Sequence, residues 1–159
     1  MRSTTKLDEI EEKMNSVTKR HLTAPCGLDC FNCEIYEGNI TEDMKKRFAE
    51  KIHKDPEDVA CKGCRQEKGC RHLGLPCETL RCIEGKGLEF CFECEEFPCV
   101  MLQPAREGAD RFPHNFKVFN LCRMKSAGVE QWADKEAKLI RQRYYAGKFI
   151  PGKGPVLER

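Results

Sequence analysis

Large apolar side chains are scarce in this sequence. Leu, Ile, Val and Phe together make up only about a fifth of the 159 residues, close to the level below which a chain fails to bury a core. Charged residues account for 34 % of the chain. We therefore expect one domain that needs something besides apolar burial to hold it together. The length also excludes most large catalytic architectures.

The sequence has no long hydrophobic run. No stretch approaches the roughly 18 apolar residues of a membrane span, and residues 1–22 are mixed in charge, without the apolar segment of a secretory signal. We therefore expect a cytoplasmic protein with no membrane partner. Because thiols stay reduced in the cytosol, dense cysteines there indicate metal binding or redox chemistry. Disulfides formed outside the cell are the less favoured alternative.

Cysteine is what the sequence has in abundance. Eleven of the twelve cysteines fall within 74 residues and include three Cys-x2-Cys pairs. Two thiolates on one tight turn can reach a single ion, and a closed four-ligand zinc site contributes of order 10 kcal/mol to folding. The pattern predicts two or three zinc ions, with these metal ligands: Cys26, Cys30, Cys33, Cys61, Cys64, Cys70, Cys77, Cys82, Cys91, Cys94 and Cys99.

The sequence leaves the pairing of these ligands open. One grouping takes the last eight in two consecutive sets, which are Cys61, Cys64, Cys70 and Cys77, then Cys82, Cys91, Cys94 and Cys99. Interleaved pairings are equally allowed. A third site would recruit a histidine, such as His72 or His53. We exclude Cys122, because a lone cysteine inside a predicted helix is usually a small buried hydrophobe.

Helical spacing appears at both ends of the chain. Residues 1–22 predict an N-terminal helix, and a second, core-facing helix follows Thr41 and stops before Asp55-Pro56. The stretch 61–99 contains seven glycines or prolines, which is typical of loops and short turns. After Pro113, two helical stripes separated by Gly128 predict a helical hairpin.

These elements predict a small, mostly helical or α+β domain. Helices would pack around cysteine-rich loops that bound metal ions hold together, with little regular sheet. We place the cysteine-rich domain and its C-terminal helices at residues 23–146. The glycine- and proline-rich tail, residues 147–159, is expected to be extended or disordered.

Charge is concentrated near the C-terminus. Residues 100–159 carry a formal charge of +6, whereas zinc held by thiolates would make the cysteine-rich part anionic. A basic region of this kind contacts nucleic acid or an acidic protein, although a solvated helix face is its commoner use. No small-molecule substrate can be identified. The residues expected to meet a partner are Arg123, Lys125, Lys135, Lys138, Arg141, Arg143 and Lys148.

The cysteine motifs also occur in a specific order. They run Cys26-Gly-Leu-Asp-Cys-Phe-Asn-Cys33, Cys61-Lys-Gly-Cys64, Cys77, Leu-Arg-Cys82, and Cys91-Phe-Glu-Cys-Glu-Glu-Phe-Pro-Cys99, then a helix with Trp132. This order, over roughly residues 24–145, resembles a widespread bacterial and archaeal family of cysteine-rich domains of unknown function that is usually regarded as zinc-binding. The resemblance implies ligand roles for the matching cysteines and no reaction. Cys70 and Cys122 belong less clearly to the shared pattern.

An iron–sulfur cluster is the alternative to zinc. The spacing of Cys26, Cys30 and Cys33 is similar to the three-thiolate motif of radical S-adenosylmethionine enzymes, but about 125 residues follow it, too few for their partial barrel. An iron–sulfur electron carrier is the more economical form of this alternative. No phosphate-binding loop is present, since Gly85-Lys-Gly87 lacks the spacing. We therefore expect a zinc-binding module that binds a partner and is not an enzyme.

Overall fold

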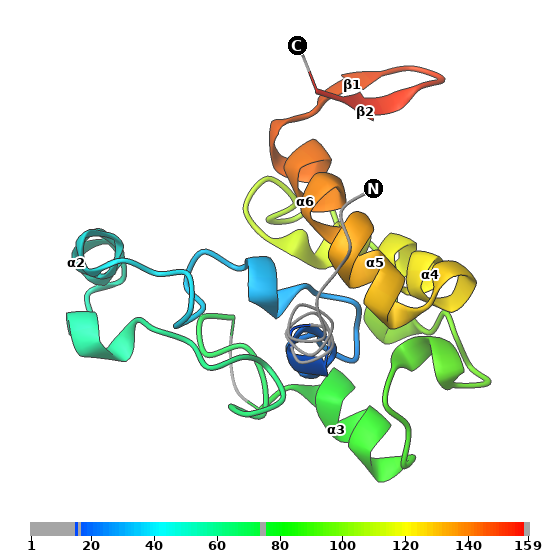
Figure 1. Cartoon of the computed structure of the whole chain (residues 1–159), viewed down its shortest axis with the longest axis horizontal. Helices are drawn as coiled ribbons and strands as arrows, with labels where there is room; N and C mark the ends of the chain where they lie inside the picture. Colours follow the sequence, from blue (N-terminus) through cyan, green and yellow to red (C-terminus); the bar gives the residue numbers. More distant parts are fainter. Residues whose placement is uncertain (1–14, 16, 74–75, 158–159) are drawn as a thin grey trace, which may run out of the picture.

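The protein is mostly helical. The structure, a computed structural model, describes residues 15, 17–73 and 76–157 (Figure 1). The main elements are α2 (Glu42–Ile52), α3 (Glu78–Gly85), α4 (Lys117–Ala127), α5 (Val129–Lys135), α6 (Ala137–Ala146), β1 (Lys148–Ile150) and β2 (Gly154–Val156). In the described residues, β1 and β2 form the one sheet, which is antiparallel. The expected fold class, mostly helical with little sheet, is confirmed. Residues 17–21 are helical, but most of the expected helix at 1–22 lies outside the described residues.

Local signals in the sequence explain the limits of α2. The Thr41 hydroxyl accepts a hydrogen bond from the Met44 N–H at 3.3 Å, and His53 ends the helix in a left-handed conformation. The expected start and end are confirmed. We expected α2 to face the core. This holds only in part, because Ala49 alone among the residues of α2 is buried. Figure 1 shows α2 at one end of the molecule, away from α4, α5 and α6.

The hydrophobic core is built on α4 and α5. Trp132 and Leu121 are fully buried, and the ring of Phe31 meets Trp132 edge-on, with centroids 6.0 Å apart. Gly128 separates the two helices with a positive φ of 89°, so the predicted hairpin is confirmed. These helices thus provide the surface on which the first cysteine loop, residues 26–33, packs.

The second helix of the hairpin is broken into α5 and α6, which the sequence stripe did not predict. The break lies at Glu136, where φ is −120°. Both carboxylate oxygens of Glu136 accept hydrogen bonds from the Arg123 guanidinium, at 2.7 Å each. A bidentate pair of this kind holds the side chain in one orientation, which ties the break to α4.

Two segments expected to lack regular structure form it. Within 61–99, α3 forms because the stretch after Cys77 has no glycine or proline until its end, and Leu80 and Ile83 share a buried face. In the tail, residues 151–153 turn the chain so that β1 pairs with β2. Glycine and proline here make a turn between two extended strands, so residues 148–156 take the extended one of the two expected forms.

Cys122 is exposed, which contradicts its expected burial. It lies on α4 three residues after Phe119, which is also exposed, whereas Leu121 and Met124 face the core. Residues three apart share a helix face. The apolar stripe of α4 is therefore narrower than its sequence indicates, and Cys122 lies on its solvent side.

Two polar contacts tie the C-terminal helices to the first cysteine loop. The buried Asn120 side chain in α4 donates to the Gly27 carbonyl at 2.7 Å. In α6, Arg141 pairs with Asp29 at 2.8 Å, and Asp29 is only 1 % exposed. Burial raises the pKa of Asp29, and the charge of Arg141 opposes that shift. Removing one partner of such a buried pair would leave an uncompensated charge.

Candidate metal centre

All twelve cysteines are free thiols, and the eleven predicted ligands are buried or half-buried. We describe these eleven cysteines in three groups. The pocket group is Cys82, Cys91, Cys94 and Cys99; the inner group is Cys26, Cys30, Cys64 and Cys77; the outer group is Cys33, Cys61 and Cys70.

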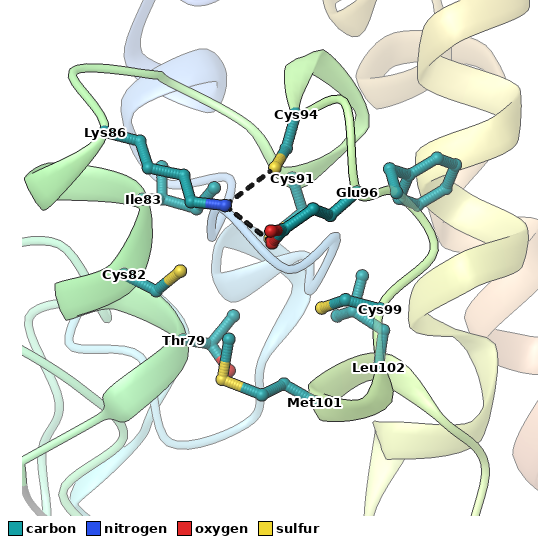
Figure 2. A pocket seen from close by; sticks show the side chains of 11 residues that line it. Thr79, Cys82, Ile83, Lys86, Cys91, Cys94, Glu96, Cys99, Met101 and Leu102 are labelled. Carbon is teal, nitrogen blue, oxygen red and sulfur yellow. Dashed lines mark hydrogen bonds and ion pairs between the residues drawn. The ribbon is translucent and has the colours of Figure 1, made fainter.

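The pocket group lines one small cavity (Figure 2). Cys82 comes from α3, whereas Cys91 begins a short 3-10 helix, Cys91–Glu93, and Cys94 ends it. Cys99 precedes a second 3-10 helix, Val100–Leu102. The cavity volume is about 20 Å³, room for one water-sized body. Four thiols from α3 and the two short turns therefore line one small cavity.

Backbone hydrogen bonds hold the turn that carries two of these thiols. The Glu93 carboxylate accepts from the N–H groups of Glu89 and Phe90, at 2.8 and 2.9 Å, and the Cys94 N–H donates to the Cys91 carbonyl at 3.2 Å. Burial raises the pKa of Cys91 to about 12, and the neighbouring charges of Cys26, Cys99, Cys82 and Cys94 add to that increase. The other three thiols of the pocket group are thus all electrostatic neighbours of Cys91.

Lys86 is a residue of this site that sequence reasoning did not find. Its ammonium donates to the Cys94 sulfur at 3.2 Å and to the Glu96 carboxylate at 2.7 Å (Figure 2). The Glu96 hydrogen bond lowers the pKa of that carboxyl group. Glu96 thus holds the Lys86 ammonium beside the Cys94 thiol. A lysine between two glycines carries no pattern that points to a thiol.

The inner group joins three separate segments. Burial raises the pKa of Cys64 most, and the charges of Cys26, Cys30, Cys77 and then Cys70 raise it further. The pKa of Cys30 is raised to about 12, mainly by burial, although the Cys64 N–H donates to its sulfur and opposes that shift. The Leu28 N–H donates to the Cys26 sulfur. Cys64 thus lies among thiols from the first cysteine loop and from the start of α3.

The outer group lies where two chain segments run side by side. The Cys61 N–H donates to the Ile35 carbonyl at 2.8 Å, which places Cys61 beside the residues that follow Cys33. Burial raises the pKa of Cys61, and Cys70 and Cys33 are among its charged neighbours. A ring nitrogen of His72, a candidate fourth ligand, lies 2.8 Å from the Val59 carbonyl.

The positions of the cysteines can be compared with the two consecutive sets of four ligands that the sequence allows. The second set coincides with the pocket group. In the first set, beyond the effect of burial, Cys77 and Cys70 both raise the pKa of Cys64, and Cys70 also raises that of Cys61, so these four thiols are neighbours too. At the first cysteine loop, Cys33 and Cys26 are the thiols whose charges most raise the pKa of Cys30, so these three cysteines are also neighbours.

The chemistry of these donors fits zinc, but their spacing does not yet form a closed site. Among residues 17–73 and 76–157, no three His, Cys, Asp or Glu side chains are placed to hold one ion as they stand. Zinc–sulfur bonds of about 2.3 Å require sulfurs about 3.8 Å apart in a tetrahedron. An ion in the cavity would therefore have to draw the four sulfurs of the pocket group inward.

The basic C-terminal residues are not all available to a partner. Arg123 pairs with Glu136, and Arg141 pairs with the buried Asp29. The predicted partner contact therefore stays a prediction that rests on fewer cations. In the part of the chain that the structure describes, no helix has the length and apolar character needed to cross a bilayer.

Comparison with known proteins gives a family and no activity. No curated protein and no solved structure matches the chain. A family described as "Protein of unknown function (DUF3795)" matches residues 22–104. That stretch contains all three thiol groups and ends before α4. Because the match covers just over half of the 159 residues, the chain belongs to this cysteine-rich family of unknown function.

Proposed function

We propose that the protein is a zinc-binding module in which the pocket group holds one structural zinc ion. The observation that carries this proposal is that four thiols from α3 and two short helical turns line one cavity of about 20 Å³. Sulfur ligands in a set of four are typical of structural zinc sites. The zinc-stabilised module would then act by binding a partner protein or nucleic acid.

The size of the cavity and the identity of the cysteines that line it support zinc over an iron–sulfur cluster. A space for one water-sized body suits a single ion better than a cluster of several atoms. The cavity lining contains none of the three cysteines of the first loop, which are the strongest sequence argument for a cluster.

Zinc in the pocket group would compensate for the thin core. It would link α3 to residues 91–102, a stretch with two short 3-10 turns in place of longer helices. Since a structural ion contributes free energy directly to folding, removing it should destabilise the protein.

The test begins with metal analysis. The protein is purified anaerobically without chelator, and zinc, iron and acid-labile sulfide are measured per chain. We expect a colourless protein with zinc and no sulfide. Cys91→Ser should lose one zinc ion per chain, whereas Cys122→Ser should lose none because Cys122 is exposed on α4.

Two results would overturn the proposal. A brown protein with iron and sulfide in equal amounts would establish a cluster instead. A wild-type protein without bound metal, which also fails to take up added zinc in equilibrium dialysis, would exclude a metal role for the pocket group.

A further inference from the structure

We propose that α6 and the β1–β2 hairpin form a binding surface for single-stranded nucleic acid, centred on Phe149. This surface, the hairpin face, consists of Lys138, Arg143, Tyr145, Phe149 and Lys153. The proposal rests on the partner-binding part of the proposed function and not on the zinc site. Nucleic acid is favoured over an acidic protein because exposed aromatic rings accompany the cations.

The hairpin face belongs to a segment that has no carboxylate side chain. Residues 137–157 contain five lysines and arginines but no Asp or Glu. The two acidic residues just before this segment are already paired, Asp134 with Lys19 and Glu136 with Arg123, at nitrogen–oxygen distances of 2.7 Å. These two carboxylates therefore do not neutralise the positive charge of the segment.

Three cations of the segment are exposed and unpaired in the described part of the chain. Lys138, Arg143 and Lys153 make no ion pair with a carboxylate of residues 17–73 or 76–157. Arg141 differs from them, because it pairs with the buried Asp29. Exposed cations without a competing carboxylate suit a polyanion, whose condensed counterions are released when lysine or arginine contacts its phosphates.

Two aromatic side chains are exposed among these cations. Phe149, the middle residue of β1, is 73 % exposed, and Tyr145, near the end of α6, is 43 % exposed. The Arg141 guanidinium lies over the Tyr145 ring, 5.5 Å from its centroid. Tyr144 is engaged elsewhere, since its hydroxyl donates to the Ala109 carbonyl at 2.7 Å. Exposed rings beside cations are typical of a surface on which bases stack.

The hairpin is held against the end of α6. The Gly147 N–H donates to the Arg143 carbonyl at 2.9 Å. A Cβ added to Gly147 would lie 2.9 Å from the Cβ of Pro155 in β2, so the hairpin folds back closely on the helix. Figure 1 shows the hairpin beyond the end of α6, away from α2 and α3. Phe149 is therefore held on an ordered element, yet it is not part of the core cluster.

Stacking on Phe149 requires bases that are unpaired. In a duplex, each base is stacked on its neighbours, so a side chain at the surface does not reach the face of a base. A single strand offers base faces and phosphates together. An acidic peptide would contact the cations and leave the Phe149 ring without a stacking partner. Because every base has a π-face, we expect little preference for sequence.

Fluorescence anisotropy tests the proposal with the intact wild-type protein, purified anaerobically without chelator. The probes are a labelled single-stranded DNA of about 16 nucleotides, the RNA strand of the same sequence and the corresponding DNA duplex, with polyglutamate as competitor. We expect a single strand to bind more tightly than the duplex, and polyglutamate to compete weakly. The DNA and RNA strands together show whether the sugar matters. Affinity should fall as salt rises, since phosphate contacts release counterions.

Variants locate the binding surface. Phe149→Ala should weaken single-strand binding about 5- to 100-fold, the usual effect of losing one stacked base. Phe149→Trp should keep the affinity, whereas Phe149→Leu, which is apolar but has no π-face, should lose it. Phe119→Ala is the matched control, because Phe119 is also exposed but lies on α4. Arg143→Gln should lower the salt dependence of binding, and Lys46→Gln on α2 should leave it unchanged.

The alternatives give distinct results. Equal or tighter binding of the duplex, or displacement of the strand by polyglutamate at equal charge, would overturn the proposal, as would equal effects of Phe149→Ala and Phe119→Ala. Zinc is measured in the same samples. A zinc-loaded protein that binds no single strand would overturn this inference and leave the proposed zinc site standing. A protein without zinc that binds through Phe149 would do the reverse.

Discussion

Lys86 places a positive charge directly against one thiol of the pocket group. Its ammonium lies 3.2 Å from the Cys94 sulfur and is held there by Glu96. A thiolate that binds zinc carries negative charge, so a charge-assisted N–H···S contact stabilises the bound form. Neighbours that orient and neutralise metal ligands contribute strongly to metal affinity.

Lys86→Met should therefore weaken zinc binding in the pocket group by about 10- to 100-fold. Methionine keeps the length of the side chain but removes its charge and its N–H donors. Competition with a chromophoric zinc chelator measures the change. Lys45→Met is the control, because Lys45 pairs with Glu42 on α2, at the far end of the molecule. Equal affinity in both variants would show that Lys86 does not act on the site.

Single residues show where sequence reasoning stops. The types of the eleven clustered residues were enough to predict thiol chemistry, and their burial is consistent with it. The exposure of Cys122 and the contact of Lys86 with Cys94 were not predictable. Both depend on which side of an element faces the rest of the molecule, and no local pattern specifies that for a single residue.

Among the elements, α4 and the first cysteine loop meet closely at Gly27. This glycine has φ of +91°, and a Cβ added to it would lie 2.7 Å from the Lys117 carbonyl oxygen. The conformation is strained for any other residue, and the approach leaves no room for a side chain. The contact lets Asn120 reach the Gly27 carbonyl.

Gly27→Ala should lower the free energy of unfolding by about 1–3 kcal/mol, from backbone strain and the forced separation of α4 from the loop. Chemical denaturation of the zinc-loaded protein measures it. Gly85→Ala is the matched change, since nothing lies within 4 Å of the Cβ it would add, and its stability should stay within about 1 kcal/mol of wild type. Equal stabilities would contradict the role assigned to Gly27.

Elements with strong local signals were predictable. The Thr41 cap and Gly128 mark helix limits that the structure confirms. The glycine and proline content of 61–99 predicts loops and so misses α3, which forms where residues 78–84 contain neither residue. The grouping of thiols was not predictable either, since contacts such as that of Cys64 with Cys30 join residues far apart in the sequence.

At the scale of the whole molecule, the core extends beyond the segment that defines the family. The family match ends at residue 104, yet half of the buried core cluster lies after it, in Leu121, Met124, Val129, Trp132, Ala133 and Ala137. The cysteine-rich segment and the C-terminal helices thus share one core.

Residues 22–104 alone should therefore fail to fold cooperatively, even with zinc. Without α4 and α5, the apolar side chains that pack on Trp132 and Leu121 face water, a large loss for a chain so poor in apolar residues. Residues 1–146, which lack only β1, β2 and the end of the chain, should unfold in one transition. Near-UV circular dichroism and thermal melts separate the cases. A sharp transition for 22–104 would show that the core is divisible.

The position of Trp132 has a practical consequence. It is the only tryptophan in the sequence, it is fully buried, and its nearest ring belongs to Phe31, between Cys30 and Cys33. Its intrinsic fluorescence thus comes from the contact between the core and the first cysteine loop. Emission at longer wavelength would signal that this loop has left the core, so the unlabelled protein carries its own optical reporter of this contact, including any change caused by loss of the proposed zinc.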